Sequence, residues 1–218
     1  HGLDLSVSDI GPSRNRTAAR MPLALPISLP LLELLGYFLA EGHAEERYLL
    51  ISCAEPEIQQ RLRGCLDTLG LRWFTRSNGY DHVVPSRLYA DVFTQWCGAR
   101  AREKHLPVFW PQLNRAQLGL FLAAYFTGDG GVERDEVTVT TASPQLASEL
   151  SYALTGFGLA ARITTPMKRA TNSNHQGARY HRLSLSGVDQ IKRFVDQINF
   201  LSMRKCQAAE ACLEKQAN

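Results

Sequence analysis

The chain has 218 residues, of which 44% are apolar, with a formal net charge of +3 and a pI of about 8.7. These values are typical of an ordinary folded protein with one large domain or two of about 100 residues. No window reaches the roughly 18 uninterrupted apolar residues that cross a membrane, so we expect no membrane association. The five cysteines are scattered without Cys-x-x-Cys spacing, which argues against structural zinc and favours a reducing compartment, cytoplasmic or organellar.

The first 29 residues are polar and then rich in proline, and we expect them to form an N-terminal arm. Arg14, Arg16 and Arg20 in this arm are expected either to touch phosphate or to be merely solvated. Pro30 suits the first turn of a helix, which runs to Glu41, and Gly42 is a natural C-terminal stop.

The elements that follow alternate between strands and helices. After a strand at 48–52, proline 56 opens a helix that ends near residue 70. Strands at 71–76 and 80–84 flank the turn Ser77-Asn78-Gly79, and a helix follows at 87–97. The same order recurs as a motif helix, a strand at 137–140, a helix from 144 to about 158, strands at 161–165 and 179–186, and a helix at 188–198. We therefore expect an α+β protein with two antiparallel sheets.

The two series of elements are a sequence repeat at an offset of 88 residues. From Leu34 to Leu71 the first copy aligns without a gap to the stretch from Leu122 to Leu159, and 11 of 38 aligned positions are identical. Each copy opens with a small, apolar helix that ends in one carboxylate and a glycine: LLGYFLAEG in the first copy, LAAYFTGDG in the second. Two such helices packed side by side would bring Glu41 and Asp129 together. A duplicated domain follows from the repeat alone.

The two motifs resemble those of a LAGLIDADG homing endonuclease, in their sequence, in their spacing of about ninety residues and in the order of elements after each. The resemblance implies a duplicated αββαββα fold whose two antiparallel sheets form a pseudo-twofold, DNA-binding saddle. The implied boundaries are an N-terminal arm at 1–29, a first half at 30–110 and a second half at 111–218. The chain also lacks room for a splicing domain and ends in Ala217-Asn218 without a preceding histidine, so we expect a free-standing, intron-encoded monomer.

The resemblance also implies a metal site at the ends of the two motif helices. Glu41 and Asp129 would hold Mg²⁺, for which Mn²⁺ would substitute, because hard divalent cations prefer oxygen ligands. The backbone carbonyls of Ala40 and Gly128 would supply further ligands. Each half ends with a lysine at a comparable place, and Lys104 is the stronger candidate for a catalytic lysine, with Lys205 as its counterpart and Lys168 as a third option.

DNA contacts are expected from the sheet faces and their hairpins, because the major groove admits a two-stranded ribbon and arginine, asparagine and glutamine read base edges there. No acid lies between Glu149 and Asp189, a stretch with several basic residues. The expected DNA-binding residues are Arg72, Arg76, Asn78, His82 and Arg87 in the first half, and Lys168, Arg169, Asn172, Asn174, His175, Gln176, Arg179 and Arg182 in the second.

The leading functional hypothesis is a metal-dependent endonuclease that cuts a long, asymmetric site in double-stranded DNA and leaves short 3′ overhangs. One alternative is a maturase that binds intron RNA, and another is a DNA-binding regulator that has lost the chemistry. Retention of both motif acids favours cleavage, because neither alternative requires them.

Overall fold

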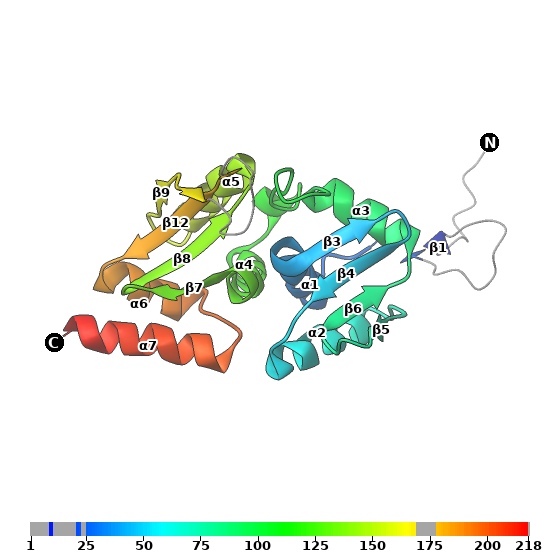
Figure 1. The fold of residues 1–218 in the computed structure, drawn as a ribbon, viewed down its shortest axis with the longest axis horizontal. Coiled ribbons are helices and arrows are strands. Elements are labelled where there is room, and N and C mark those ends of the chain that lie inside the picture. The colour runs from blue at the N-terminus through cyan, green and yellow to red at the C-terminus, as the bar shows by residue number, and fades with distance from the viewer. Residues whose placement is uncertain (1–8, 11–20, 23–24, 169–177, 218) are drawn as a thin grey trace.

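The computed structural model describes residues 9–10, 21–22, 25–168 and 178–217. Within these residues the chain is an α+β protein with two four-stranded antiparallel sheets and seven α-helices. Both halves follow the order helix, two strands, helix, two strands, helix, which confirms the duplicated fold expected from the repeat (Figure 1).

The first half begins with the motif helix α1 (Leu29–Glu41) and the hairpin of β3 (Gly42–Glu45) and β4 (Tyr48–Ser52). Helix α2 (Pro56–Thr68), strands β5 (Phe74–Thr75) and β6 (Asp81–Val84), and helix α3 (Arg87–Cys97) complete it. The strand order is β3-β4-β6-β5, with all pairs antiparallel.

The second half repeats this plan with the motif helix α4 (Arg115–Asp129), β7 (Gly130–Glu133), β8 (Glu136–Thr141), α5 (Pro144–Thr155), β9 (Arg162–Thr164), β12 (His181–Ser186) and α6 (Val188–Gln197). Its strand order is β7-β8-β12-β9. A small ribbon of β10 (Met167–Lys168) and β11 (Ala178–Arg179) lies between β9 and β12 in the sequence. A short 3₁₀ turn, Trp110–Gln112, precedes α4, and β1 (Asp9–Ile10) pairs with β2 (Met21–Pro22) near the N-terminus.

Local sequence explains where the helices begin. Asn114 and Gln117 form a reciprocal capping box at the start of α4. The Ser143 hydroxyl accepts a hydrogen bond from the Leu146 N–H at the start of α5, and Pro144 follows it. In the first half Glu55 occupies the equivalent N-cap position of α2, again followed by a proline.

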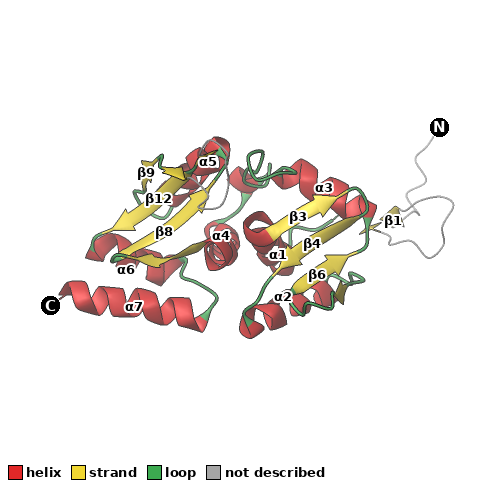
Figure 2. Ribbon diagram, viewed as in Figure 1, coloured by secondary structure: helices red, strands yellow, loops and turns green. Residues whose placement is uncertain are grey.

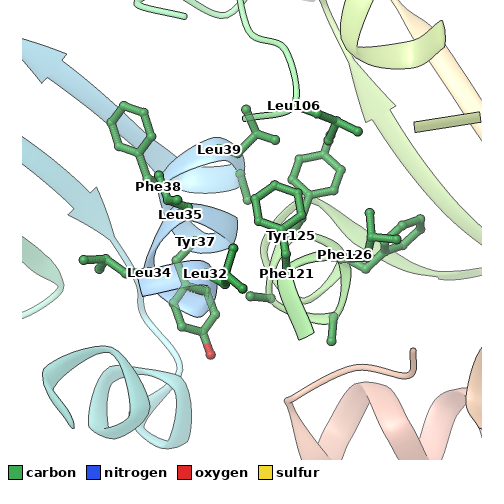
Figure 3. Close-up of a cluster of buried hydrophobic side chains, with 14 of the residues drawn as sticks. Leu32, Leu34, Leu35, Tyr37, Phe38, Leu39, Leu106, Phe121, Tyr125 and Phe126 are labelled. Atoms are coloured by element: carbon green, nitrogen blue, oxygen red, sulfur yellow. The ribbon is translucent and has the colours of Figure 1, made fainter. Parts of the chain in front are cut away.

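The two motif helices lie side by side between the sheets and form the centre of the core (Figures 1 and 2). Almost every side chain from Leu31 to Ala40 is buried, as are those from Phe121 to Thr127. Figure 3 shows this contact, in which Leu32 of α1 lies near Phe121 of α4 and Leu39 lies near Tyr125. One apolar core therefore joins the two halves.

Two details differ from the sequence prediction. Gly42 is not a left-handed helix stop, because its φ is −104° and it begins β3 directly. Glycine is needed there for space, since a Cβ atom would lie 2.7 Å from the Phe38 carbonyl oxygen. The chain also continues past α6 into helix α7 (Met203–Ala217), which has no counterpart in the first half. None of the helices in the described residues has the length and apolar character needed to cross a membrane.

Candidate active site

Glycines let the motif helices approach closely enough to bring their ends together. A Cβ atom on Gly36 would lie 2.6 Å from both the Ala124 Cβ and the Phe121 carbonyl oxygen. A Cβ atom on Gly128 would collide with Ala40 and would lie 3.3 Å from the Glu41 Cγ. Glu41 is therefore packed against the last turn of the other motif helix, as the two acids require if they are to act together.

The two acids terminate their helices at equivalent places. Glu41 is the last residue of α1 and Asp129 the last residue of α4, and both retain solvent-exposed surface. The packing of protein around Asp129, together with the nearby charge of Glu41, raises the pKa of Asp129 to about 7, although Lys104 and Lys205 oppose the shift. Two carboxylates that disfavour each other's charge form a site that a cation would stabilise.

A buried hydroxyl lies beside the second acid. Tyr125 is fully buried, and its hydroxyl has no hydrogen-bond partner of normal geometry among the described residues. It is nevertheless close enough to lower the pKa of Asp129, and burial beside that acid raises the pKa of Tyr125 itself. The equivalent residue of the first motif, Tyr37, instead donates to Glu33, one turn back along α1, at 2.9 Å.

The two predicted lysines occupy matching positions at the helix ends. The Lys104 ammonium donates to the carbonyl oxygens of Leu39, at 2.6 Å, and Ala40, at 3.3 Å. Carbonyls in the last turn of a helix have no partner within the helix, so a cation there is favourable. Burial lowers the pKa of Lys104, and the charges of Asp129 and Glu41 oppose this shift.

Lys205 repeats the arrangement on the other helix. Its ammonium donates to the carbonyl oxygens of Thr127, of Gly128 at 3.2 Å and of Gly130 at 2.7 Å. Burial also lowers the pKa of Lys205, against the opposing charge of Glu55. Sequence comparison paired these two lysines, and the structure places both beside the acids.

The protein supplies only some of the oxygen ligands that a hard divalent cation needs. Glu41 and Asp129 offer carboxylate oxygens, but no cluster of three histidine, cysteine or acidic ligands occurs within the described residues. The Ala40 and Gly128 carbonyls, expected as ligands, are each hydrogen-bonded to a lysine, which uses one of two lone pairs. Mg²⁺ usually keeps several waters and takes substrate phosphate oxygens, so two carboxylates fit it.

Two hollows lie near the ends of the motif helices, and one lysine lines each of them. One, of about 370 Å³, is lined by Glu41, Gly128, Lys205 and the β4–α2 connection. The other, of about 510 Å³, is lined by Gly42, His43 and Lys104, with neighbouring residues of β3 and of the loop after α3. The two hollows are not equivalent, because Glu41 lines the first and neither acid lines the second.

The open faces of the sheets carry side chains that point away from the helices. In β12, Leu183 and Leu185 belong to the core, so Arg182 and Ser184 point to the opposite face. Arg182 forms an ion pair with Glu133 at 3.0 Å, and Arg162 forms one with Glu136 at 2.9 Å. The open face of the second sheet is therefore less basic than we expected, because acids offset its arginines.

Of the expected DNA-binding residues of the first half, some are exposed near β5 and its hairpin, and others do not lie on an open sheet face. Arg72 and Arg76 are exposed near β5, and Arg76 lies over the Tyr48 ring and 3.7 Å from Asp81. Asn78 is exposed, but its side chain accepts hydrogen bonds from the Tyr80 and Asp81 N–H groups and so shapes the hairpin.

Two residues of that set do not lie on an open sheet face. His82 is a correction, because it is 1% exposed on the helix-covered side of β6, where its ring approaches Trp73 and Thr75. Arg87 is exposed on helix α3, where it pairs with Glu46 and Asp91.

In the second half, Arg182 lies on the open sheet face, Arg179 is exposed on β11, and Lys168 belongs to β10. Five expected residues fall outside the described residues: Arg169, Asn172, Asn174, His175 and Gln176. The list of expected DNA-binding residues missed Arg162, which is exposed on β9. Thr138 and Ser184 also alternate away from the core, but both are almost completely buried.

The duplicated α+β fold, with one acid at the end of each motif helix, is similar to the LAGLIDADG fold. Residues 116–199 match the family model described as a LAGLIDADG-like domain. The chain is similar to I-DmoI in complex with DNA and Ca, with a TM-score of 0.56 and 16% identity over 85% of this chain and 98% of that one. Other I-DmoI structures are with DNA and Mn, or with target DNA and Mg. Full-length DUF199/WhiA from Thermatoga maritima is similar at a TM-score of 0.56, with 14% identity, covering 89% of this chain and 62% of that one.

Curated relatives are longer proteins. A replication factor C small subunit of Thermococcus kodakarensis is 26% identical, over 97% of this chain and 24% of that protein. A DNA polymerase II large subunit of the same organism is 29% identical, over 92% of this chain and 12% of that protein. The chain thus spans about a quarter or less of the length of the curated relatives it matches.

Proposed function

We propose that the protein is a site-specific endonuclease that hydrolyses both strands of a long, asymmetric duplex DNA site and leaves short 3′ overhangs. The observation that carries the proposal is the pseudo-symmetric group of two acids and two lysines at the ends of the paired motif helices. Neither the packing of the core nor DNA binding alone requires this group, whereas phosphodiester hydrolysis uses each of its members.

Glu41 and Asp129 are the residues that would hold Mg²⁺ or Mn²⁺. When bound, the metal supplies charge stabilisation and a more acidic water. Lys104 donates to two carbonyls and keeps a third donor, which would position a water or a phosphate oxygen. Lys205 donates to three carbonyls and would release one of them to do the same. Burial lowers the pKa of both lysines, which makes a proton exchange with water easier than for a lysine in solvent.

The two open sheet faces would bind duplex DNA on either side of the acids. Arg162 and Arg182 would leave Glu136 and Glu133 for DNA. The likeness in fold to I-DmoI, which is solved with DNA, supports this arrangement. A monomer is sufficient, because one chain contains both halves of the site.

The curated relatives support a mobile module. Replication factor C and a DNA polymerase have different functions, yet a segment of each, a quarter of its length or less, is similar to this chain. A segment shared by two such proteins agrees with a homing endonuclease. Intron encoding and a free-standing chain stay predictions, as does residence in a reducing compartment.

Cleavage of a randomised duplex library with Mg²⁺ tests the proposal. The wild type should give discrete cuts, which Glu41→Gln and Asp129→Asn should abolish. Asp196→Asn, which changes an exposed acid of α6 that pairs with Lys192, should cut like the wild type. A wild type that selects a sequence but never cuts it, even with Mn²⁺, refutes the enzyme and favours the regulator; selection of RNA instead favours the maturase.

A further inference from the structure

Each active-site lysine sits on a segment that is held by the opposite half of the molecule. Lys104 belongs to the end of the first half, and Lys205 to the end of the second. Both ammonium groups bind the motif helix of their own half. The backbone around each, however, is fixed by the helix after β4 or β8 in the other half.

Around Lys104 this fixation comes from α5. The Ser143 hydroxyl, at the N-cap, donates to the Lys104 carbonyl oxygen at 2.6 Å. Two residues further along, the Leu106 N–H donates to the Glu149 carboxylate at 2.6 Å. Ser143 and Leu106 are almost completely buried and Glu149 is half-buried, so both bonds are partly shielded from water.

Around Lys205 the fixation comes from α2. Glu55, at the N-cap equivalent to Ser143, forms an ion pair with Arg204. Two residues before the lysine, the Met203 N–H donates to the Glu57 carboxylate at 3.1 Å. Unlike the contacts around Lys104, these contacts are exposed, and the Arg204 side chain is 72% accessible. Figure 1 shows the start of α7 beside α2.

We propose that Glu149 and Glu57 are positioning residues, each of which holds the lysine of the opposite half at the active site. Each carboxylate accepts a backbone N–H two residues from its lysine, and neither touches the acids or the hollows. The lysines can reach their helix ends only while the two halves keep their mutual orientation. The inference rests on the proposed function for the part the lysines play in cleavage, but the positioning itself does not.

The two contacts differ in strength because of their surroundings. Loss of the Glu149 carboxylate leaves the buried Leu106 N–H without a partner, and a charge-assisted bond in low dielectric is strong. The contacts of Glu57 and Arg204 are screened by water and salt. Lys104 should therefore depend on its positioning residue more than Lys205 does.

Acetylation of the full-length protein without metal or DNA tests the positioning directly. Mass spectrometry gives the modification rates of Lys104 and Lys205 separately. Glu149→Ala should raise the Lys104 rate about tenfold and leave Lys205 unchanged, as loss of one buried charge-assisted bond predicts. Glu57→Ala should raise only the Lys205 rate, by about threefold, because its contact is exposed. Glu149→Gln retains an acceptor oxygen and should restore protection of Lys104.

Asp196→Ala is the matched control for removal of a helical carboxylate, and urea unfolding of every variant identifies general destabilisation. Equal acceleration of both lysines by Glu149→Ala, no acceleration at all, or no rescue by Glu149→Gln would overturn the inference.

Cleavage gives the second readout. Because each lysine occupies its own hollow, Glu149→Ala and Glu57→Ala should accumulate nicks in opposite strands of the selected site. Nicks in the same strand, or equal slowing of both strands, would also contradict the inference. If the wild type cuts no DNA, the proposed function fails, whereas the acetylation result still decides the positioning.

Discussion

Substitution of Gly36 by alanine should test whether close packing of the motif helices sets the stability of the whole chain. Gly36 lies in the middle of α1, and an added Cβ would come within 2.6 Å of Ala124 Cβ and of the Phe121 carbonyl oxygen. A backbone oxygen cannot turn aside as a flexible side chain does. The two helices must therefore separate along their contact.

Two opposing effects determine the change in the free energy of unfolding for Gly36→Ala. Alanine in place of glycine favours a helix by about 1 kcal/mol. Overpacking a core costs about 1–3 kcal/mol, and a fixed backbone oxygen places this site near the upper end. Separation of the helices by a fraction of an ångström also weakens their dispersion contacts. The net expectation for Gly36→Ala is a loss of about 2 kcal/mol.

Gly64→Ala is the matched control. Gly64 lies in helix α2, and a Cβ atom there would meet nothing within 4 Å. Helix propensity then acts alone, so this variant should gain about 0.5–1 kcal/mol.

Urea unfolding and thermal unfolding of the three proteins provide the measurement. Gly36→Ala should lower Tm by about 4–8 °C and Gly64→Ala should raise it by about 1–4 °C, at roughly 2–4 °C per kcal/mol for a chain of this size. A Gly36→Ala protein as stable as the wild type would refute the argument from close helix packing. So would a Gly64→Ala protein that loses as much stability as Gly36→Ala.

Three further outcomes are expected. Lys104→Met and Lys205→Met should each slow cleavage about a hundredfold, the size typical of a lost proton-transfer group, in single-turnover assays; unaltered rates would remove the lysines from the mechanism. Arg61→Met should lower the free energy of unfolding, measured in urea, by about 1–3 kcal/mol, because the buried Glu33 carboxylate loses hydrogen bonds of 2.8 and 3.1 Å. Adding Glu33→Gln to the same protein should recover part of this stability. Glu133→Gln should tighten DNA binding about threefold at low salt by releasing Arg182, and unchanged affinity would show that the pair does not oppose DNA.

Most of the fold and the two active-site acids could be predicted from the sequence, because both are repeated in it. Two copies of a helix that ends in an acid and a glycine locate Glu41 and Asp129. Lys104 and Lys205 were paired because each half ends with a lysine at a comparable place, and not by the offset of 88 residues. The predicted helix at 87–97 and strand at 48–52 agree with α3 and β4.

Elements that lie outside the repeat were not predicted from the sequence. Helix α7 has no partner in the first half, although its alanine, glutamate and lysine content favours a helix. His82 illustrates a second limit. In a strand of four residues, both faces of which are largely buried, alternation does not reveal which side a polar residue takes. Charge on the sheet faces could not be inferred either, since the ion pair of Arg162 and Glu136 joins residues 26 positions apart.

The two motif tyrosines have acquired separate tasks. In a symmetric dimer of identical subunits, Tyr37 and Tyr125 would be the same residue in the same surroundings. Here the Tyr37 hydroxyl completes a structural contact with Glu33, while the Tyr125 hydroxyl lies beside Asp129. Fusion of both halves into one chain thus allows one copy of a helix to specialise in holding the scaffold and the other in tuning an acid. The motif helices are alike in shape, yet exchanging them would not conserve the chemistry.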